Sequence, residues 1–254
     1  MPSSPRLIAF DLDDTLAPSK SPLDPRMASL LVALLEKVQV CVISGGQFAQ
    51  FKMQLIDELP NTAEPILHRL HLMPTCGTQY YRYDGAWRQI YAENLSGGEK
   101  SRALAAVEET AKSLGFWEPK TWGPILEDRG SQITFSALGQ AAPVAEKMGW
   151  DVSGDKKNAL RAAVQVLIPD LEVRSGGSTS IDITRQGIDK AYGIARLSEL
   201  TKISVADMLF VGDRLDPDGN DFPVVALGIP TFAVTDWVHT AEFLDSLLVQ
   251  LQHA

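Results

Sequence analysis

The stretch Leu7–Ser19, LIAFDLDDTLAPS, decides the interpretation of this chain, because it places three carboxylates directly after an apolar run. The run RLIAF shows no polar alternation, which is typical of a strand buried on both faces of a parallel sheet. Asp11, Asp13 and Asp14 then occupy three of the next four positions. An ionised carboxylate without a partner is costly to remove from water. The segment is therefore either an acidic loop or a site where a cation and a substrate compensate the charge.

The bulk composition narrows the setting. At 254 residues and 45% hydrophobic content, the chain is long enough for one large domain or two unequal ones. The net charge is −9 and no basic block stands out, which argues against nucleic acid and anionic membranes as main partners. No apolar run approaches the ~18 residues that span a bilayer. Cys41 and Cys76 form no disulfide framework, so we expect two core cysteines and a cytoplasmic protein.

Alternating strands and helices dominate both ends of the chain, and a different pattern lies between them. Near the start, Asp24-Pro25 predicts a helix N-terminus, and VQVCVIS predicts a second buried strand that ends in Ser44-Gly45-Gly46. In the middle, YYRYDGAWRQIYAE predicts an aromatic hairpin, and Ser96 with Glu99 forms a capping box. We therefore predict an α/β protein with a Rossmann-like parallel-sheet core, residues 1–78 and 186–254, interrupted by an α+β insert, residues 79–185.

Polar signals follow the predicted core strands at the points where those strands end. Asp11 and Asp13 follow the first strand, Ser44 follows the second, Asp213 follows a late one, and Lys190 opens a helix. Each of these alone is common in loops or on surfaces. In open parallel sheets, however, ligands bind outside the carboxyl ends of the strands. We therefore expect these side chains to converge on one site.

These motifs carry a family resemblance. DLDDT after an apolar strand, Ser44, Lys190 and VGDRLDPDGND resemble the four motifs of the haloacid dehalogenase (HAD) phosphatase superfamily. The long insert resembles the cap of the sugar-phosphatase-like branch of that superfamily. Within the branch, RSGGSTSIDITRQGIDK and FVGDRLDPDGNDFP are similar to segments of the eukaryotic-type phosphomannomutases.

The resemblance implies a role for each core residue. Asp11 would be the nucleophile that forms an aspartyl-phosphate, and Asp13 the general acid. Mg²⁺, a hard cation, would bind Asp11, the backbone carbonyl of Asp13, and Asp213. Around the phosphoryl group, the implied partners are Lys190, Ser44 with backbone N–H groups at Gly45, and Asn220 with Asp221, which would orient the phosphate and Lys190. We expect Asp14, Asp216 and Asp218 to be solvated loop acids.

The insert carries the clues to the substrate. In STSIDIT, the alternation places Ser180 and Asp182 on one strand face, a pattern that a half-exposed antiparallel strand without a function would also show. In the mutases, residues matching these two bind sugar hydroxyls, and Arg129 matches a cap arginine that contacts the distal phosphate. The mutases carry a second phosphate-binding arginine eleven residues further on, where this chain has Gln140. Lys20 also stands where the mutases have an arginine.

We therefore predict a Mg²⁺-dependent phosphomonoester hydrolase that acts on a sugar phosphate or a similar small phosphorylated metabolite through an aspartyl-phosphate. Phosphomannomutase, which interconverts hexose 1- and 6-phosphates, is the alternative. A response-regulator receiver groups similar residues but has about half this length. A catalytically inactive sugar-binding module conflicts with the intact set Asp11, Asp13, Lys190 and Asp213. The aromatic hairpin is either a homodimer interface or a cover for the sheet of the insert.

Overall fold

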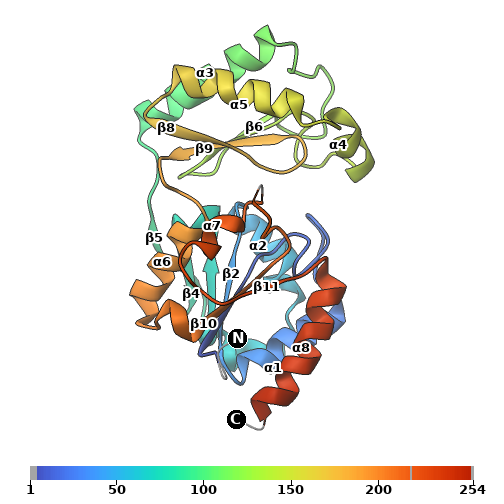
Figure 1. The fold of residues 1–254 in the computed structure, drawn as a ribbon, viewed down its shortest axis with the longest axis vertical. Coiled ribbons are helices and arrows are strands. Elements are labelled where there is room, and N and C mark those ends of the chain that lie inside the picture. Colours follow the sequence, from blue (N-terminus) through green and yellow to red (C-terminus); the bar gives the residue numbers. More distant parts are fainter. Residues whose placement is uncertain (1–4, 218, 253–254) are drawn as a thin grey trace. The chain divides into compact units, whose positions relative to one another are not determined.

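The computed structural model describes residues 5–217 and 219–252. The chain divides into a core unit, Met1–Ala92 with Asp189–Ala254, and a cap unit, Glu93–Ile188. Figure 1 shows the elements of both units. Among the described residues, no helix is long and apolar enough to cross a membrane.

A seven-stranded sheet of order β11-β10-β1-β2-β3-β4-β5 forms the centre of the core unit. Its strands are β1 (Leu7–Phe10), β2 (Gln39–Ile43), β3 (Leu70–Met73), β4 (Gln79–Tyr83), β5 (Trp87–Ala92), β10 (Met208–Gly212) and β11 (Thr231–Ala233). The five strands from β11 to β3 run parallel to one another. Strand β4 pairs antiparallel with β3, and β5 pairs antiparallel with β4. Strand β1 lies between β10 and β2, and every side chain of LIAF is fully buried, as the uninterrupted apolar run predicts.

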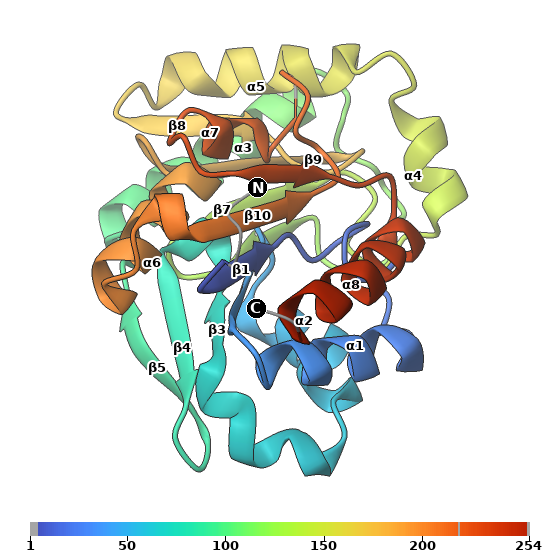
Figure 2. The same cartoon turned by 60° about the horizontal axis from the view of Figure 1, so that its bottom comes forward.

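Helices cover both faces of this sheet. They are α1 (Pro25–Leu35), α2 (Phe48–Gln54), α6 (Lys190–Thr201), α7 (Phe222–Val225) and α8 (Trp237–Gln252). Ile8 and Phe10 belong to an apolar cluster with residues of α1 and α8. Figure 2 shows these two helices side by side. Leu7 and Ala9 belong to the cluster that contains α6. Asp24 caps α1 by accepting a hydrogen bond from the Arg26 N–H, with proline at the first helical position, which confirms the predicted helix start.

The aromatic hairpin forms as predicted but belongs to the core unit. Strand β4 pairs with β3 through His71↔Arg82 and Leu72↔Tyr81, so β4 and β5 extend the core sheet. The predicted insert of 79–185 therefore begins too early: the cap unit starts at Glu93 and ends at Ile188. The Asp84-Gly85 turn shows that two strands pair with each other, but the sheet they join is decided by distant partners such as His71.

The cap unit is a four-stranded antiparallel sheet of order β6-β7-β9-β8 with three helices. Its elements are α3 (Gly97–Ser113), β6 (Leu126–Asp128), β7 (Ile133–Ser136), α4 (Val144–Trp150), α5 (Asp155–Leu167), β8 (Leu171–Ser175) and β9 (Ser180–Arg185). The capping box of α3 is present as predicted. Ile133, Phe135, Ile181 and Ile183 form an apolar sheet face that packs in one cluster with residues of α3 and α5. Both helices lie along this sheet in Figure 1.

Candidate active site

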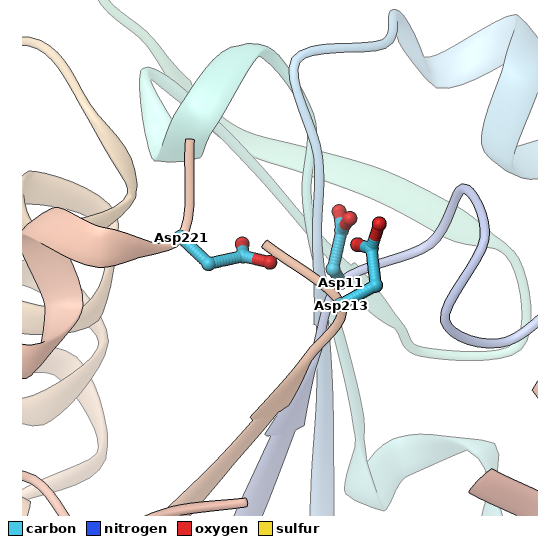
Figure 3. Close-up of side chains that lie close together, drawn as sticks. All are labelled: Asp11, Asp213 and Asp221. Atoms are coloured by element: carbon cyan, nitrogen blue, oxygen red, sulfur yellow. The ribbon is translucent and has the colours of Figure 1, made fainter. Parts of the chain in front are cut away.

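Three carboxylates meet at the carboxyl ends of the central strands. Strand β1 leads into Asp11, whose N–H donates to the Val211 carbonyl at 3.1 Å, and the adjacent strand β10 leads into Asp213. Asp221, at the start of α7, comes from the opposite side and points towards these two side chains (Figure 3). One oxygen from each of the three carboxylates lies within 4.8 Å of the others. The parallel register of β1 and β10 is what brings two acids from distant parts of the sequence together.

Lys190 joins two of these acids. Its Nζ lies 2.6 Å from Asp11 Oδ1 and 2.6 Å from Asp221 Oδ1, and its side chain is only 1% exposed. Lys190 is the first residue of α6, a helix that Asp189 caps by accepting from the Tyr192 N–H at 2.9 Å. The helix start therefore fixes the ammonium group beside the nucleophile that the sequence predicts.

Asp221 is held in place by the loop that precedes it. Its Oδ2 accepts from the Arg214 N–H at 3.1 Å, and its own N–H donates to the Arg214 carbonyl at 3.1 Å. A Cβ on Gly212 would lie 2.4 Å from Asp221 Oδ2, so only glycine leaves room for this carboxylate. Asp221 is fully buried and fixed by these contacts, so it can hold the Lys190 ammonium in place, which is the role predicted for it. Asn220, which was predicted to share this role, is exposed.

The electrostatics of the cluster follow from burial and from crowded charge. Burial raises the pKa of Asp11 well above its usual range, Lys190 opposes the rise, and Asp221 and Asp213 add to it. The pKa of Asp213 is also raised, by burial and then by Asp221. Burial by itself would lower the pKa of Lys190, but the two flanking carboxylates outweigh it, so the ammonium stays charged. The cluster thus holds one buried ammonium, from Lys190, and three carboxylates, from Asp11, Asp213 and Asp221.

A hard divalent cation fits this donor set. Carboxylate oxygens are the ligands that Mg²⁺ prefers, and a second positive charge would lower the raised pKa values of Asp11 and Asp213. Asp11 and Asp213, both predicted as ligands, lie together, and Thr15 Oγ1 donates to Asp213 Oδ1 at 3.3 Å. Asp221, which the resemblance implied only for orienting the phosphate and Lys190, is a third candidate ligand. The backbone carbonyl of Asp13 stays a prediction.

Asp13 does not join the acid cluster through its side chain. Its carboxylate accepts hydrogen bonds from the backbone N–H and the ammonium group of Lys20, and from the amides of Gln50 and Gln54 on α2. Burial raises the pKa of Asp13, but Lys20 and these hydrogen bonds outweigh it, so the pKa is lowered overall. Nothing in the local sequence pattern of α2 marks Gln50 or Gln54 as partners of Asp13.

Ser44 occupies the buried turn after β2. Its hydroxyl oxygen accepts from the Gly46 N–H at 3.2 Å, which leaves the hydroxyl hydrogen able to donate elsewhere, and Gly45 has open space on its Cβ side. The Ser44 carbonyl accepts from the Cys76 N–H at 2.9 Å. Thr75 and Cys76 have φ angles of 49° and 54°, a strained left-handed backbone beside this turn. Sequence reasoning missed this second loop, although Pro74 and Gly77 mark it as a turn.

Two of the predicted substrate residues of the insert, Ser180 and Asp182, share one polar sheet face in the cap unit. Thr134 pairs with Asp182 and Ser136 with Ser180 across β7 and β9, opposite the apolar face. Thr134 Oγ1 donates to Asp182 Oδ1 at 2.7 Å, and the predicted contact residue Arg129, near this sheet, is paired with Glu127 at 2.7 Å.

Gln140 lies at the end of the same polar face. Its amide donates to Ser136 Oγ at 2.6 Å, and Lys147 Nζ donates to the Gln140 carbonyl at 2.7 Å. A neutral amide therefore stands at the position where the family resemblance implies an arginine, with one lysine near it.

Two of the remaining predicted acids, Asp14 and Asp216, lie in loops. Asp14 is exposed with a φ of 61° and accepts from the Ser19 N–H at 3.0 Å. Asp216 is exposed and paired with Arg214 at 2.9 Å. Asp218 lies outside the described residues.

Comparisons with known proteins show the family of this chain. The family model described as eukaryotic phosphomannomutase matches residues 27–229. The chain belongs to this family. It is 26% identical to phosphomannomutase 1 of Homo sapiens over 226 residues, which cover 87% of this chain and 83% of the human protein.

Solved structures show the same fold. A structure of IMP-nucleotidase from Plasmodium falciparum superposes with a TM-score of 0.70 at 16% identity, covering 100% of this chain and 69% of that one. A haloacid dehalogenase-like hydrolase from Bacteroides thetaiotaomicron gives a TM-score of 0.64 at 16% identity, covering 96% and 100%. These structures share the α/β, Rossmann-like fold of this chain, and its membership of the phosphomannomutase family makes it an enzyme that acts on phosphate.

Proposed function

We propose that this phosphomannomutase-family chain is a Mg²⁺-dependent phosphomonoester hydrolase that acts on a sugar phosphate or a similar small phosphorylated metabolite. The observation that carries the phosphoryl-transfer chemistry is the buried Lys190 ammonium at 2.6 Å from Asp11. The observation that favours water as acceptor is the neutral Gln140 amide on the polar cap face. Phosphomannomutase is the second candidate, and the family match favours it.

In the first step, a carboxylate oxygen of Asp11 attacks the phosphorus atom and the bond from phosphorus to the substrate oxygen breaks. Lys190 offsets negative charge on the phosphoryl oxygens, and the Ser44 hydroxyl donates a hydrogen bond to them. Asp13 gives a proton to the departing sugar oxygen; because its lowered pKa and its four hydrogen-bond donors favour the ionised carboxylate, it must first leave a donor and take up that proton from water. A bound Mg²⁺ would offset further charge on the phosphoryl group, with Asp11 and Asp213 as its protein ligands.

In the second step, water attacks the phosphorus of the aspartyl-phosphate. Asp13 takes the proton from this water, the bond from phosphorus to Asp11 breaks, and inorganic phosphate leaves. In a mutase, a sugar hydroxyl would replace the water. That reaction must retain a sugar with two phosphates while it reorients, which requires a strong grip on the distal phosphate.

The cap unit supplies groups suited to a sugar, and of the two implied phosphate-binding positions only one carries an arginine, Arg129, which is paired with Glu127. Ser180, Asp182 and Thr134 offer hydroxyl and carboxylate oxygens on one face, as sugar hydroxyls require. Arginine binds phosphate through a bidentate fork that a glutamine amide cannot reproduce. Gln140 therefore supports a weak distal grip and escape of any bisphosphate.

The test compares two products from one substrate. Wild-type protein with a hexose 1-phosphate should release inorganic phosphate faster than it forms the 6-phosphate, with or without a hexose 1,6-bisphosphate activator. Gln140→Arg should shift this ratio towards interconversion by roughly tenfold or more, because a charge-assisted hydrogen bond contributes about 1.5–3 kcal/mol.

Asp11→Asn is the control for both activities, because the amide is nearly isosteric but cannot form an acyl phosphate. The cleanly folded variant should lose both products. Conversion of mannose 1-phosphate to mannose 6-phosphate by wild-type protein, with little phosphate release, would establish the mutase instead.

A further inference from the structure

The Asp13 carboxylate is saturated with hydrogen bonds. Oδ1 accepts from the Lys20 backbone N–H at 2.8 Å and from Gln54 Nε2 at 3.2 Å. Oδ2 accepts from Lys20 Nζ at 3.1 Å and from Gln50 Nε2 at 3.0 Å. Two carboxylate oxygens together offer about four acceptor sites. In this arrangement no site is left for a substrate oxygen or a water molecule, so at least one of these bonds must break before Asp13 exchanges a proton.

The two bonds to Oδ1 are firmly held. Gln54 is fully buried, and its amide also donates to the Ser21 carbonyl at 2.9 Å. Its carbonyl oxygen Oε1 is buried without a hydrogen-bond partner among the described residues. Leaving this oxygen unpaired costs free energy, which the two hydrogen bonds donated by the amide nitrogen offset. The other donor is a backbone N–H, in a residue whose φ of 58° defines a tight turn.

The two bonds to Oδ2 come from side chains that can move. The Lys20 side chain is 33% exposed and Gln50 is half-buried. Lys20 Nζ also donates to Gln50 Oε1 at 2.7 Å, so the two side chains brace each other across Oδ2. Gln50 lies against the turn after β2. A Cβ on Gly46 in this turn would come within 2.3 Å of Gln50 Oε1.

We propose that Gln50 and the Lys20 ammonium form a latch on Oδ2 of Asp13, and that Gln54 and the Lys20 N–H form an anchor on Oδ1. At least one latch bond to Oδ2 must break before Asp13 can protonate the leaving oxygen. The anchor bonds to Oδ1 meanwhile hold the carboxylate in its orientation. Gln50 and Gln54 are then positioning residues with opposite effects. The inference rests on the proposed role of Asp13 in phosphoryl transfer.

The test uses two matched variants and two substrates. A sugar phosphate needs a proton on its leaving oxygen, whereas the phenolate of p-nitrophenyl phosphate leaves without one. With the sugar phosphate, Gln50→Leu should raise kcat above the wild-type level with KM unchanged, because it removes a latch bond, and an unchanged kcat overturns the latch. Gln54→Leu should lower kcat about tenfold, the equivalent of about 1.4 kcal/mol.

With p-nitrophenyl phosphate, the first-turnover burst of p-nitrophenol should be unchanged in both variants, because this step needs no proton from Asp13. Gln89→Leu, an exposed position on β5, is the control for the substitution itself. Thermal unfolding checks each variant. If Gln54→Leu does not fold, Gln54→Asn, which keeps an amide but shortens its reach, replaces it.

The outcomes separate the latch from the proposed function. A wild-type burst combined with equal losses of kcat in Gln50→Leu and Gln54→Leu overturns the latch and leaves the phosphoryl-transfer role intact. Absence of wild-type turnover with both substrates overturns both. A crystal structure with bound orthovanadate gives a second reading: Oδ2 should have left Gln50 while Oδ1 keeps Gln54. Persistence of all four bonds in that structure overturns the latch.

Discussion

Lys190 shows how one buried cation organises the acids around it. Its ammonium compensates Asp11 and Asp221, both almost fully buried, and its removal would leave two carboxylates without their cation. Breaking a buried ion pair by removing one partner typically costs about 3–5 kcal/mol. Lys190 therefore contributes to folding as well as to chemistry, and activity lost on its substitution would not by itself establish a catalytic role.

The metal assignment makes a prediction at the residue scale. Asp213 follows β10 and lies in the acid cluster, so Asp213→Ala should raise the Mg²⁺ concentration needed for half-maximal activity by roughly tenfold or more. A chelator should remove wild-type activity, and added Mg²⁺ should restore it. Titration of activity against Mg²⁺ measures both effects.

Asp216→Ala is the matched control for this prediction. Asp216 lies in the same loop but is exposed and paired with Arg214, so its loss should leave the Mg²⁺ requirement unchanged. Full wild-type activity in excess chelator would rule out the metal.

The sequence predicts some of these residues better than others. The placement of Asp11, Ser44 and Asp213 follows from strand ends, because parallel strands present their carboxyl ends at one edge of the sheet. Lys190 is placed instead by the start of helix α6. The orientation of Asp13 does not follow, since its partners Gln50 and Gln54 lie 37 and 41 residues away. Side-chain hydrogen bonds of that range depend on the packing of α2, and no local pattern encodes it.

At the scale of elements, the hairpin of β4 and β5 also depends on contacts that its local sequence does not encode. Its two strands were predicted, but their attachment to the core depends on a buried polar network between β2, β3 and β4. His71 Nδ1 lies 2.7 Å from Tyr80 Oη, its Nε2 lies 2.8 Å from Gln39 Oε1, and Arg82 donates to Tyr80 Oη at 3.1 Å. These bonds satisfy polar groups that would otherwise be costly to bury.

This network predicts a pH dependence of stability. Burial, and then the nearby Arg82 charge, lower the pKa of His71 to about 3, whereas an unfolded histidine titrates near 6.5. Between these values the unfolded chain binds a proton that the folded chain does not, so this group lowers the free energy of unfolding as pH falls. The slope from one such group is at most about 1.4 kcal/mol per pH unit.

Comparison with His71→Gln isolates the contribution of this residue from that of the carboxylates. Chemical denaturation at pH 7.5, 6 and 5 should show wild-type stability falling faster with acidity than that of His71→Gln. His68→Gln, at an exposed histidine, should follow the wild type. Parallel pH profiles for wild type and His71→Gln would contradict the prediction.

At the scale of the whole molecule, each unit carries its own apolar core. Two clusters draw only on core-unit residues, including Phe10 and Phe210, and one draws only on cap-unit residues, including Phe135 and Trp150. Among the described residues, no cluster contains members of both units. A unit with its own core can in principle fold alone. The whole Asp11, Lys190, Asp213 and Asp221 cluster belongs to the core unit.

This organisation predicts that two deletions of the insert behave differently. Replacing residues 93–188 with a flexible Gly/Ser linker of about eight residues keeps all seven strands of the core sheet, so the product should unfold cooperatively. Replacing 79–185 with the same linker removes β4 and β5, which strips Tyr80 and Arg82 from His71 and leaves β3 as an unpaired edge. That second product should aggregate or lose several kcal/mol of stability, because an exposed apolar edge promotes pairing between chains. Thermal unfolding and size-exclusion chromatography of the two proteins measure the difference. Equal stability and solubility of the two deletions would show that the hairpin contributes nothing essential to the core, and the boundary at Ala92 would lose its physical basis.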